Sequence, residues 1–310
     1  MKPGLVCKNL TKRYKNGPMA LDNINISIPS KGIFALIGRN GAGKTTLTRI
    51  LATELLPSSG TATINGIDVV NEAGRLREQI AILPQESRAV QWLTPRQSIT
   101  SYLLYCGLSL READSRVLPT LELLGIKKNE NTLNRMLSGG VKRKVLIATV
   151  LASGSKVLFV DEPTTGLDPI SRSELWTVLN KLKKDRFIFL TTHYLEEAER
   201  LADMIGIIDE GKLVALGTLN ELRKIVKYGY SVRILQKGVS VRPRHGKLIV
   251  GENGFKQIIT TEDEADRLAK RFIRDGTRFS MNPISLEDIF YYLVKKPIET
   301  GEVEEDEGGW

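Results

Sequence analysis

A glycine-rich run that ends in lysine and threonine is the feature that most narrows the folds open to this sequence. Residues 38–46 read Gly-Arg-Asn-Gly-Ala-Gly-Lys-Thr-Thr, after a short apolar run at residues 33–37 and before a helix-like segment at residues 46–52. Backbone N–H groups of glycines can close around anionic oxygens, and the start of a helix adds a favourable dipole. The run predicts a phosphate-binding loop between a strand and a helix. A plain glycine-rich turn is the alternative.

The individual residues of this loop have separable roles toward a bound triphosphate. Lys44 is expected to reach the β and γ phosphates, and the Thr45 hydroxyl to ligate Mg²⁺. The expected nucleotide-binding residues of the loop are Gly38, Arg39, Asn40, Gly41, Ala42, Gly43, Lys44, Thr45 and Thr46.

Short apolar runs separated by helix-like stretches predict an α/β core with a mainly parallel sheet. Such runs are buried on both faces of the sheet, so they lack polar alternation. Residues 5–10 and 21–29 alternate instead and predict strands that precede the loop. The short apolar runs lie at residues 33–37, 80–83, 157–160, 187–190 and 204–208, and a hairpin turn is expected at residues 209–212.

The remaining patterns divide the chain into further parts. Residues 95–136 show apolar residues at three- and four-residue spacing, which predicts an inserted helical subdomain within about residues 86–150. Helix-like and alternating segments after residue 227 predict a small α+β domain over residues 228–297. Residues 1–227 are then the first domain, and the acidic residues 298–310 are expected to be a disordered tail.

Charge, cysteine content and hydropathy restrict where the chain works. Six of its 36 acidic residues follow residue 298, so the preceding part holds 45 basic and 30 acidic residues, a net charge of +15. An anionic membrane surface, a nucleic-acid backbone and an ordinary solvated surface all suit that charge. No apolar run approaches the roughly 18 residues of a membrane span, and the N-terminus lacks a signal-peptide core. Two isolated cysteines, Cys7 and Cys106, suit a reducing compartment, so a cytoplasmic location is expected.

Two adjacent carboxylates end a predicted strand at the edge where an open parallel sheet binds ligands. Asp161 is expected to hold Mg²⁺, and Glu162 to polarise the water that attacks the γ phosphate. Gln85 and His193 follow two other predicted strands and emerge at the same edge, where each can sense the γ phosphate. A loop amide and a helix-capping histidine are the alternative readings of those two residues.

A second glycine-containing helix start occurs at residues 137–140, which read Leu-Ser-Gly-Gly. Ser138 is placed as an N-cap, and Gly139 and Gly140 permit close approach to an anion. One subunit can hardly use both helix starts on one nucleotide, whereas an antiparallel dimer would bring Ser138 of one copy to Lys44 of the other. An ordinary helix start is the alternative.

Taken in order, these motifs resemble the nucleotide-binding subunit of an ATP-binding cassette (ABC) transporter over about residues 4–226. The resemblance identifies Gln85 as the Q-loop residue, residues 137–140 as the signature and His193 as the switch histidine. It also implies an adenine-stacking role for Tyr14 and a dimer-crossing D-loop at residues 166–168, including Asp168. ATP and Mg²⁺ are the implied ligands, with Thr45, Gln85 and Asp161 on the metal. Val141 departs from the glutamine usual in the signature, which puts one polar contact across the interface in doubt.

The resemblance also implies partners and a mechanism. Residues 192–199 and 283–290 look like the branch of the family that serves exporters of drugs, lipids, polysaccharides or sodium, although the second stretch also reads as a capped amphipathic helix. Two chains would bind two ATP molecules head-to-tail and drive a separate membrane permease from the inner face of the membrane. A soluble ABC ATPase acting on nucleic acid or ribosomes is the competing function. A non-hydrolysing nucleotide binder is a third, and Glu162 and His193 argue against it.

Overall fold

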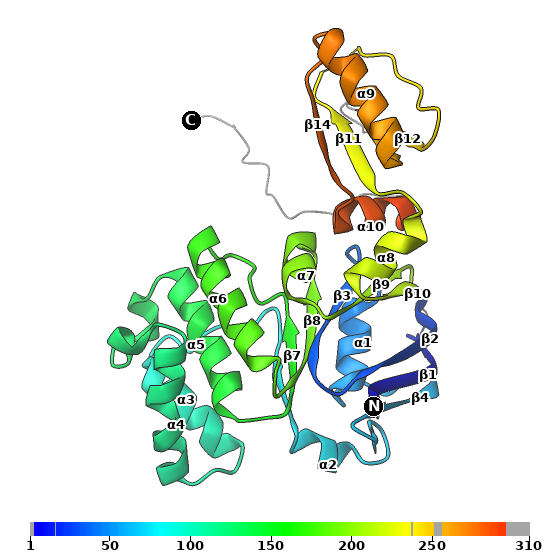
Figure 1. The fold of residues 1–310 in the computed structure, drawn as a ribbon. Helices are drawn as coiled ribbons and strands as arrows, with labels where there is room; N and C mark the ends of the chain where they lie inside the picture. Colours follow the sequence, from blue (N-terminus) through cyan, green and yellow to red (C-terminus); the bar gives the residue numbers. More distant parts are fainter. Residues whose placement is uncertain (1–2, 16, 237, 251–255, 296–310) are drawn as a thin grey trace.

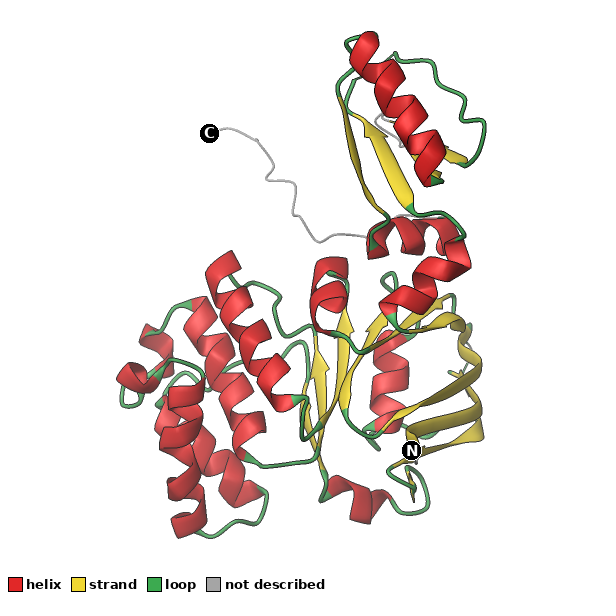
Figure 2. Ribbon diagram, viewed as in Figure 1, coloured by secondary structure: helices red, strands yellow, loops and turns green. Residues whose placement is uncertain are grey.

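The computed structural model describes residues 3–15, 17–236, 238–250 and 256–295. Three sheets and the helices around them form a larger body and a smaller unit that projects above α10 (Figures 1 and 2). The expected acidic tail at residues 298–310 lies outside the described residues. Among those described, no helix combines the length and apolar character needed to cross a bilayer.

The central sheet has six strands in the order β10-β9-β3-β8-β7-β6. The inner strands β3, β8 and β7 are buried at every residue, because elements cover both faces of the sheet, which explains their unbroken apolar sequences. β10 alone runs antiparallel, after a turn in which Glu210 and Gly211 have φ of 46° and 78°. That turn confirms the predicted hairpin. The strands are β3 (Gly32–Ile37), β6 (Ile80–Leu83), β7 (Val157–Asp161), β8 (Phe187–Thr192), β9 (Met204–Asp209) and β10 (Lys212–Gly217).

A second, antiparallel sheet packs over helix α1 (Lys44–Leu51), in the order β2-β1-β4-β5. Its inward side chains share one hydrophobic core with Phe34, Phe159 and Phe189 of the central sheet. β4 and β5 are short and largely polar, so the sequence pattern does not reveal them. The strands are β1 (Pro3–Arg13), β2 (Met19–Pro29), β4 (Ser59–Ile64) and β5 (Ile67–Asp68), and the short helix α2 (Ala73–Arg77) follows them.

The segment predicted as a helical insertion contains α3 (Pro95–Tyr105), α4 (Leu110–Leu123) and α5 (Gly139–Ala152), and no residue from 84 to 153 lies in a strand. Capping boxes at Thr94 and Ser109 begin the first two helices. Single 3-10 turns at Lys127–Asn129 and Asn134–Met136 lead to α5. The helices α6 (Pro169–Leu182) and α7 (Leu195–Leu201) complete this side of the molecule.

The C-terminal unit is an antiparallel four-stranded sheet covered on one face by α9 (Glu262–Arg274). Ala265, Leu268 and Phe272 of α9 pack on Val232 and Ile258 of the sheet in a separate small core. The strand order is β12-β13-β11-β14, with β11 (Tyr230–Ile234), β12 (Lys247–Val250), β13 (Lys256–Thr260) and β14 (Phe279–Pro283). β14 contains Ser, Asn and Pro, and its pattern does not predict a strand.

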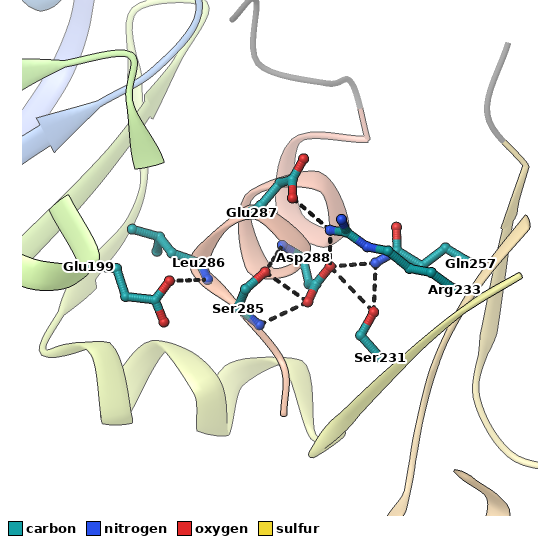
Figure 3. Close-up of polar contacts among 8 residues, drawn as sticks. All are labelled: Glu199, Ser231, Arg233, Gln257, Ser285, Leu286, Glu287 and Asp288. Atoms are coloured by element: carbon teal, nitrogen blue, oxygen red, sulfur yellow. Dashed lines mark hydrogen bonds and ion pairs between the residues drawn. The ribbon is translucent and has the colours of Figure 1, made fainter. Parts of the chain in front are cut away.

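Helices α8 (Leu219–Val226) and α10 (Leu286–Val294) attach this unit to the body. Ile289 and Phe290 of α10 join the large core that also contains β3 and β8 residues. At the start of α10, Asp288 closes a capping box with Ser285 and is also contacted by Ser231, Arg233 and Gln257 of the small sheet (Figure 3). Opposite them, Glu199 of α7 accepts the Leu286 N–H at 3.4 Å. The start of α10 therefore contacts both the small C-terminal sheet and α7 of the body.

Candidate functional site

The glycine-rich loop connects β3 directly to α1, and two of its glycines are required by the packing. A Cβ on Gly38 would lie 2.4 Å from the carbonyl oxygen of Ile208. Gly43 has φ of 108°, caps α1, and a Cβ there would lie 2.6 Å from the Ala20 carbonyl oxygen. The helix begins at Lys44, two residues before the helix-like segment predicted at residues 46–52. The loop thus has the strand-to-helix position of a phosphate site.

The side chain of Lys44 folds back onto the glycine-rich loop and binds its main-chain carbonyls. Its Nζ donates hydrogen bonds to the carbonyl oxygens of Gly38 at 2.7 Å and Arg39 at 3.0 Å, and the side chain is 7% exposed. The loop itself is closed by the Ala42 N–H, which donates to the Arg39 carbonyl. Asn40 and Gly41 are the exposed part of the turn. A cation is therefore fixed beside the N-terminus of α1, where it suits an anionic ligand.

Asp161 and Glu162 stand at the carboxyl end of β7, as predicted. Asp161 is the last residue of the strand and accepts a hydrogen bond from Thr191 Oγ1 of β8. Glu162 follows with a φ of 46°, a left-handed conformation that is strained for a residue with a side chain. Both carboxyls are buried, at 8% and 5% exposed.

The carboxylate of Glu162 contacts three side chains that come from separate segments of the chain. Gln85 Nε2 donates to Oε2 at 2.7 Å, Thr165 Oγ1 donates to the same oxygen at 3.3 Å, and His193 Nδ1 lies 3.0 Å from Oε1. Gln85 follows β6 and His193 follows β8, the strands that flank β7. The structure therefore brings Gln85, Glu162 and His193 together.

The two adjacent carboxyls have pKa values shifted in opposite directions. Burial raises the pKa of Asp161 above its ordinary value, more than the hydrogen bond from Thr191 lowers it. Burial would also raise the pKa of Glu162, but the hydrogen bond from His193 and the electrostatic interactions with His193 and Lys44 outweigh it and lower that pKa. Glu162 is therefore kept ionised at neutral pH, as a residue that polarises a water molecule must be.

Thr45, Gln85 and Asp161 line one cavity of about 280 Å³ beside the start of α1. Their hydroxyl, amide and carboxylate oxygens are the donors that Mg²⁺ prefers, and Mg²⁺ usually keeps several waters and substrate phosphates as its other ligands. Among the described residues no cluster of three or more His, Cys, Asp or Glu side chains could hold a metal. The donor set fits a cation shared with a bound phosphate rather than an all-protein metal site.

Tyr14 lies beside the first turn of α1. Its hydroxyl is 3.4 Å from Thr46 Oγ1, its side chain is 40% exposed, and Lys12 Nζ stands 5.6 Å from the ring centroid. An exposed aromatic face next to the phosphate loop is available for stacking on a purine.

The signature residues do not meet the glycine-rich loop within one chain. Ser138 is the N-cap of α5, with its Oγ accepting the Val141 N–H at 3.4 Å, and Ser138 and Gly139 are exposed. Neither lines the cavity that Thr45 shares with Asp161. A Cβ on Gly140 would instead be 3.6 Å from Asp168 Oδ2, and Asp168 caps α6 by accepting the Ile170 and Ser171 N–H groups at 3.0 Å.

Several residues of the site are not evident in the sequence pattern. Thr191 and Thr165 are ordinary hydroxyls whose contacts with the carboxylates depend on strand register and on the turn after Glu162. Arg143 is buried under the site and donates to main-chain carbonyls around Glu162. In the sequence it is the middle residue of a Lys-Arg-Lys triplet before the apolar run of α5, and that pattern does not say what the side chain contacts.

Proteins of known sequence are similar to this chain over most of its length. Residues 21–165 match the family model described as ABC transporter. The chain is 32% identical over 300 residues to Nod factor export ATP-binding protein I of Burkholderia orbicola (strain AU 1054), covering 94% of this chain and 97% of that protein. It is also 32% identical over 314 residues to daunorubicin/doxorubicin resistance ATP-binding protein DrrA of Streptomyces peucetius. This match covers 96% of this chain and 94% of that protein. It is also 36% identical over 245 residues to retinal-specific phospholipid-transporting ATPase ABCA4 of Mus musculus, covering 79% of this chain but 11% of that protein.

Solved structures agree with the sequence matches. CbiO1 from Clostridium perfringens, part of the ABC transporter complex cbiONQ, superposes with a TM-score of 0.64 at 29% identity, covering 73% of this chain and 95% of that one. A dimeric post-hydrolysis state of the ATP-binding cassette MJ0796, bound to ADP and Pi, superposes with a TM-score of 0.63 at 25% identity. The superposition covers 69% of this chain and 98% of that one. Because relatives named as ATP-binding proteins match it over nearly its full length, this chain belongs to the ABC transporter family, among its ATP-binding subunits.

Proposed function

We propose that this chain hydrolyses ATP to power an exporter, with Glu162 activating the attacking water and His193 orienting Glu162 and the γ phosphate. The observation that carries this proposal is the convergence of Gln85 and His193 on the Glu162 carboxylate, beside the cavity that Thr45 and Asp161 line. Residues 1–227 would be the ATP-binding domain, and residues 228–297 a C-terminal domain. The exporter assignment rests on the printed names of the Nod factor export and daunorubicin/doxorubicin resistance proteins.

The nucleotide would contact the loop residues from Gly38 to Thr46, with Lys44 on the β and γ phosphates and Tyr14 against the base. Thr45, Gln85 and Asp161 would hold Mg²⁺, which when bound neutralises phosphate charge. The fixed position of Lys44 and the dipole of α1 act on the same anion. Phosphate release by the purified chain with ATP, with and without Mg²⁺, tests this assignment; absence of Mg²⁺-dependent release would refute it.

We further propose a head-to-tail dimer in which Ser138, Gly139, Gly140 and Asp168 of one copy contribute to the other copy's ATP site. The exposure of the α5 N-cap, away from its own chain's cavity, supports this arrangement. The structural relative that was solved as a dimer supports it too. Each γ phosphate would then bridge two subunits, and hydrolysis would remove the bridge.

A crosslinking experiment tests the dimer. Cys7 and Cys106 are first replaced by serine, and single Asn40→Cys and Ser138→Cys chains carrying Glu162→Gln are mixed with ATP or ADP. A disulfide can then form only between subunits, and it is expected with ATP. No intersubunit disulfide under either nucleotide, while ATP binds normally, would refute head-to-tail pairing.

A separate membrane permease is the proposed partner, which would hold this chain at the inner face of the membrane. A cavity of about 840 Å³ lies between the helical insertion and the part of the body formed by α2, β6 and the end of α1, lined by residues such as Arg77, Tyr102 and Tyr105. Tyr105 is 90% exposed at its rim. Copurification from detergent-solubilised membranes with a multi-span protein, lost on Tyr105→Asp, would support the partner. Copurification with nucleic acid or ribosomes instead would favour the soluble ATPase function that the basic surface permits.

A further inference from the structure

The guanidinium of Arg143 contacts four main-chain carbonyls at the centre of the site. Nε donates to Pro163 O at 3.0 Å, and Nη2 donates to Asp161 O at 3.2 Å and to Glu162 O at 2.9 Å. Nη1 donates to Gln85 O at 3.3 Å. Arg143 belongs to α5 and is 9% exposed, so these bonds form out of water. One side chain of the helical insertion thus holds the segments after β6 and β7.

Of these four contacts, the hydrogen bond to the Glu162 carbonyl oxygen bears most directly on the mechanism. Glu162 has a left-handed φ of 46°, a conformation that persists only where the surroundings hold it. The shortest of the four hydrogen bonds from Arg143, at 2.9 Å, is accepted by the carbonyl oxygen of Glu162. The planar guanidinium offers donors in a rigid fork to several acceptors at once, which a lysine ammonium does not reproduce.

The position of Arg143 along α5 gives this contact a further meaning. Ser138 caps the helix, which begins at Gly139, and Arg143 follows less than two turns later. A displacement of the start of α5 would therefore move the guanidinium against the carbonyls of Glu162 and Gln85. The C-terminal end of α5 is held by a different arginine. Arg116 Nη1 donates to the carbonyls of Ala152 at 3.1 Å and Ser153 at 2.7 Å.

We propose that Arg143 is a positioning residue for ATP hydrolysis, which holds the backbone of Glu162 and the start of the Gln85 loop in their working geometry from α5. This inference rests on the proposed hydrolysis by Glu162. Arg143 would act through that carboxylate, without touching the nucleotide. Because α5 begins with the residues offered to the partner's ATP, occupancy of one site would be transmitted through Arg143 to the Glu162 of the same chain.

Chemical rescue of Arg143→Ala separates positioning from simple structural support. A misplacement of about 1 Å at a catalytic group can cost about 10²-fold in rate, so kcat is expected to fall roughly that much while ATP affinity changes less than about twofold. Guanidinium chloride at low millimolar concentration should restore part of kcat, because the ion fits the space left by the side chain, and ammonium chloride should not. Arg116→Ala is the matched control, since it too removes a guanidinium that donates to main-chain carbonyls, here at the far end of α5, and its kcat should stay near the parental value.

A second measurement uses Arg143→Lys, which keeps the charge and guards against failure of the alanine variant to fold. Its kcat should fall, and the loss should vanish in a Glu162→Gln background, because residues that act through one group are non-additive. Equal losses in Arg143→Ala and Arg116→Ala, no rescue by guanidinium, or additivity with Glu162→Gln would overturn the inference. Failure of the parental chain to hydrolyse ATP would refute the proposed function instead, so the two failures are distinguishable.

Discussion

Gln85 Nε2 donates a hydrogen bond to Glu162 Oε2 at 2.7 Å, although the two residues lie 77 positions apart. The other oxygen of the same carboxylate faces His193 Nδ1 at 3.0 Å. Thr165 Oγ1 also donates to Oε2, so three of the roughly four lone-pair sites of this carboxylate are occupied. The site left open is on Oε1, where an attacking water is therefore expected.

Glu162→Gln is expected to slow phosphate release by roughly 10²- to 10⁴-fold, the usual contribution of a general base. ATP binding should persist, because Glu162 is not among the phosphate contacts, and the dimer should accumulate with ATP on size-exclusion chromatography. Glu196→Gln, an exposed carboxylate of the nearby α7 paired with Arg200, is the control. Parental hydrolysis in Glu162→Gln would show that the water is activated elsewhere.

Lys44→Ala should weaken nucleotide binding itself. A hydrogen bond to a charged group contributes about 1.5 to 3 kcal/mol, so the loss in ATP affinity is expected to be on the order of 10- to 100-fold. Titration with a fluorescent ATP analogue measures it. Arg49→Ala serves as the control, since Arg49 is an exposed cation in the last turn of the same helix. Unchanged affinity in Lys44→Ala would remove the lysine from the phosphate site.

Glu264 links the stability of the C-terminal unit to pH. A hydrogen bond from Arg267 lowers the pKa of Glu264 to about 2. Since the folded pKa is depressed, the stabilisation is present above the ordinary value of 4.5 and is lost as the pH falls through about 2. Urea unfolding should show Glu264→Gln less stable than the parental chain at pH 7, with the difference shrinking below pH 4.5. Asp266→Asn, an exposed acid of the same helix, should leave the pH profile unchanged; a constant difference for Glu264→Gln would contradict the prediction.

Asp288→Ala should loosen the attachment of the small sheet (Figure 3). Asp288 Oδ2 accepts the Ser285 N–H and hydroxyl at 2.8 Å each, while its Oδ1 faces Arg233 and Gln257. Removing a buried acceptor that both caps a helix and satisfies donors typically costs about 1 to 3 kcal/mol.

Urea unfolding and limited proteolysis between α8 and β11 measure the effect. Glu287→Gln removes a neighbouring but exposed partner of Arg233 and should cost much less. Equal stability of Asp288→Ala and the parental chain would show that apolar packing of α10 alone holds the unit.

Local patterns in the sequence predicted much of the chemistry. The loop from Gly38 to Thr46, the carboxylates that end β7, and the Ser138 cap each depend on residues within one turn or one strand end. The buried parallel strands were also predictable, because continuous apolar runs suit strands covered on both faces. The order of the strands and the paths of β4, β5 and β14 were not, since they depend on neighbours far along the chain.

The contacts that make the site work belong to this second group. Gln85 meets Glu162 because β6 and β7 are adjacent in the sheet, and Arg143 reaches four carbonyls because α5 packs against that edge. Residue types and spacing state which groups are available for phosphate chemistry. Which of them touch is set by how strands and helices pack, because hydrogen bonds and side-chain contacts act over a few ångströms in space whatever the separation in sequence.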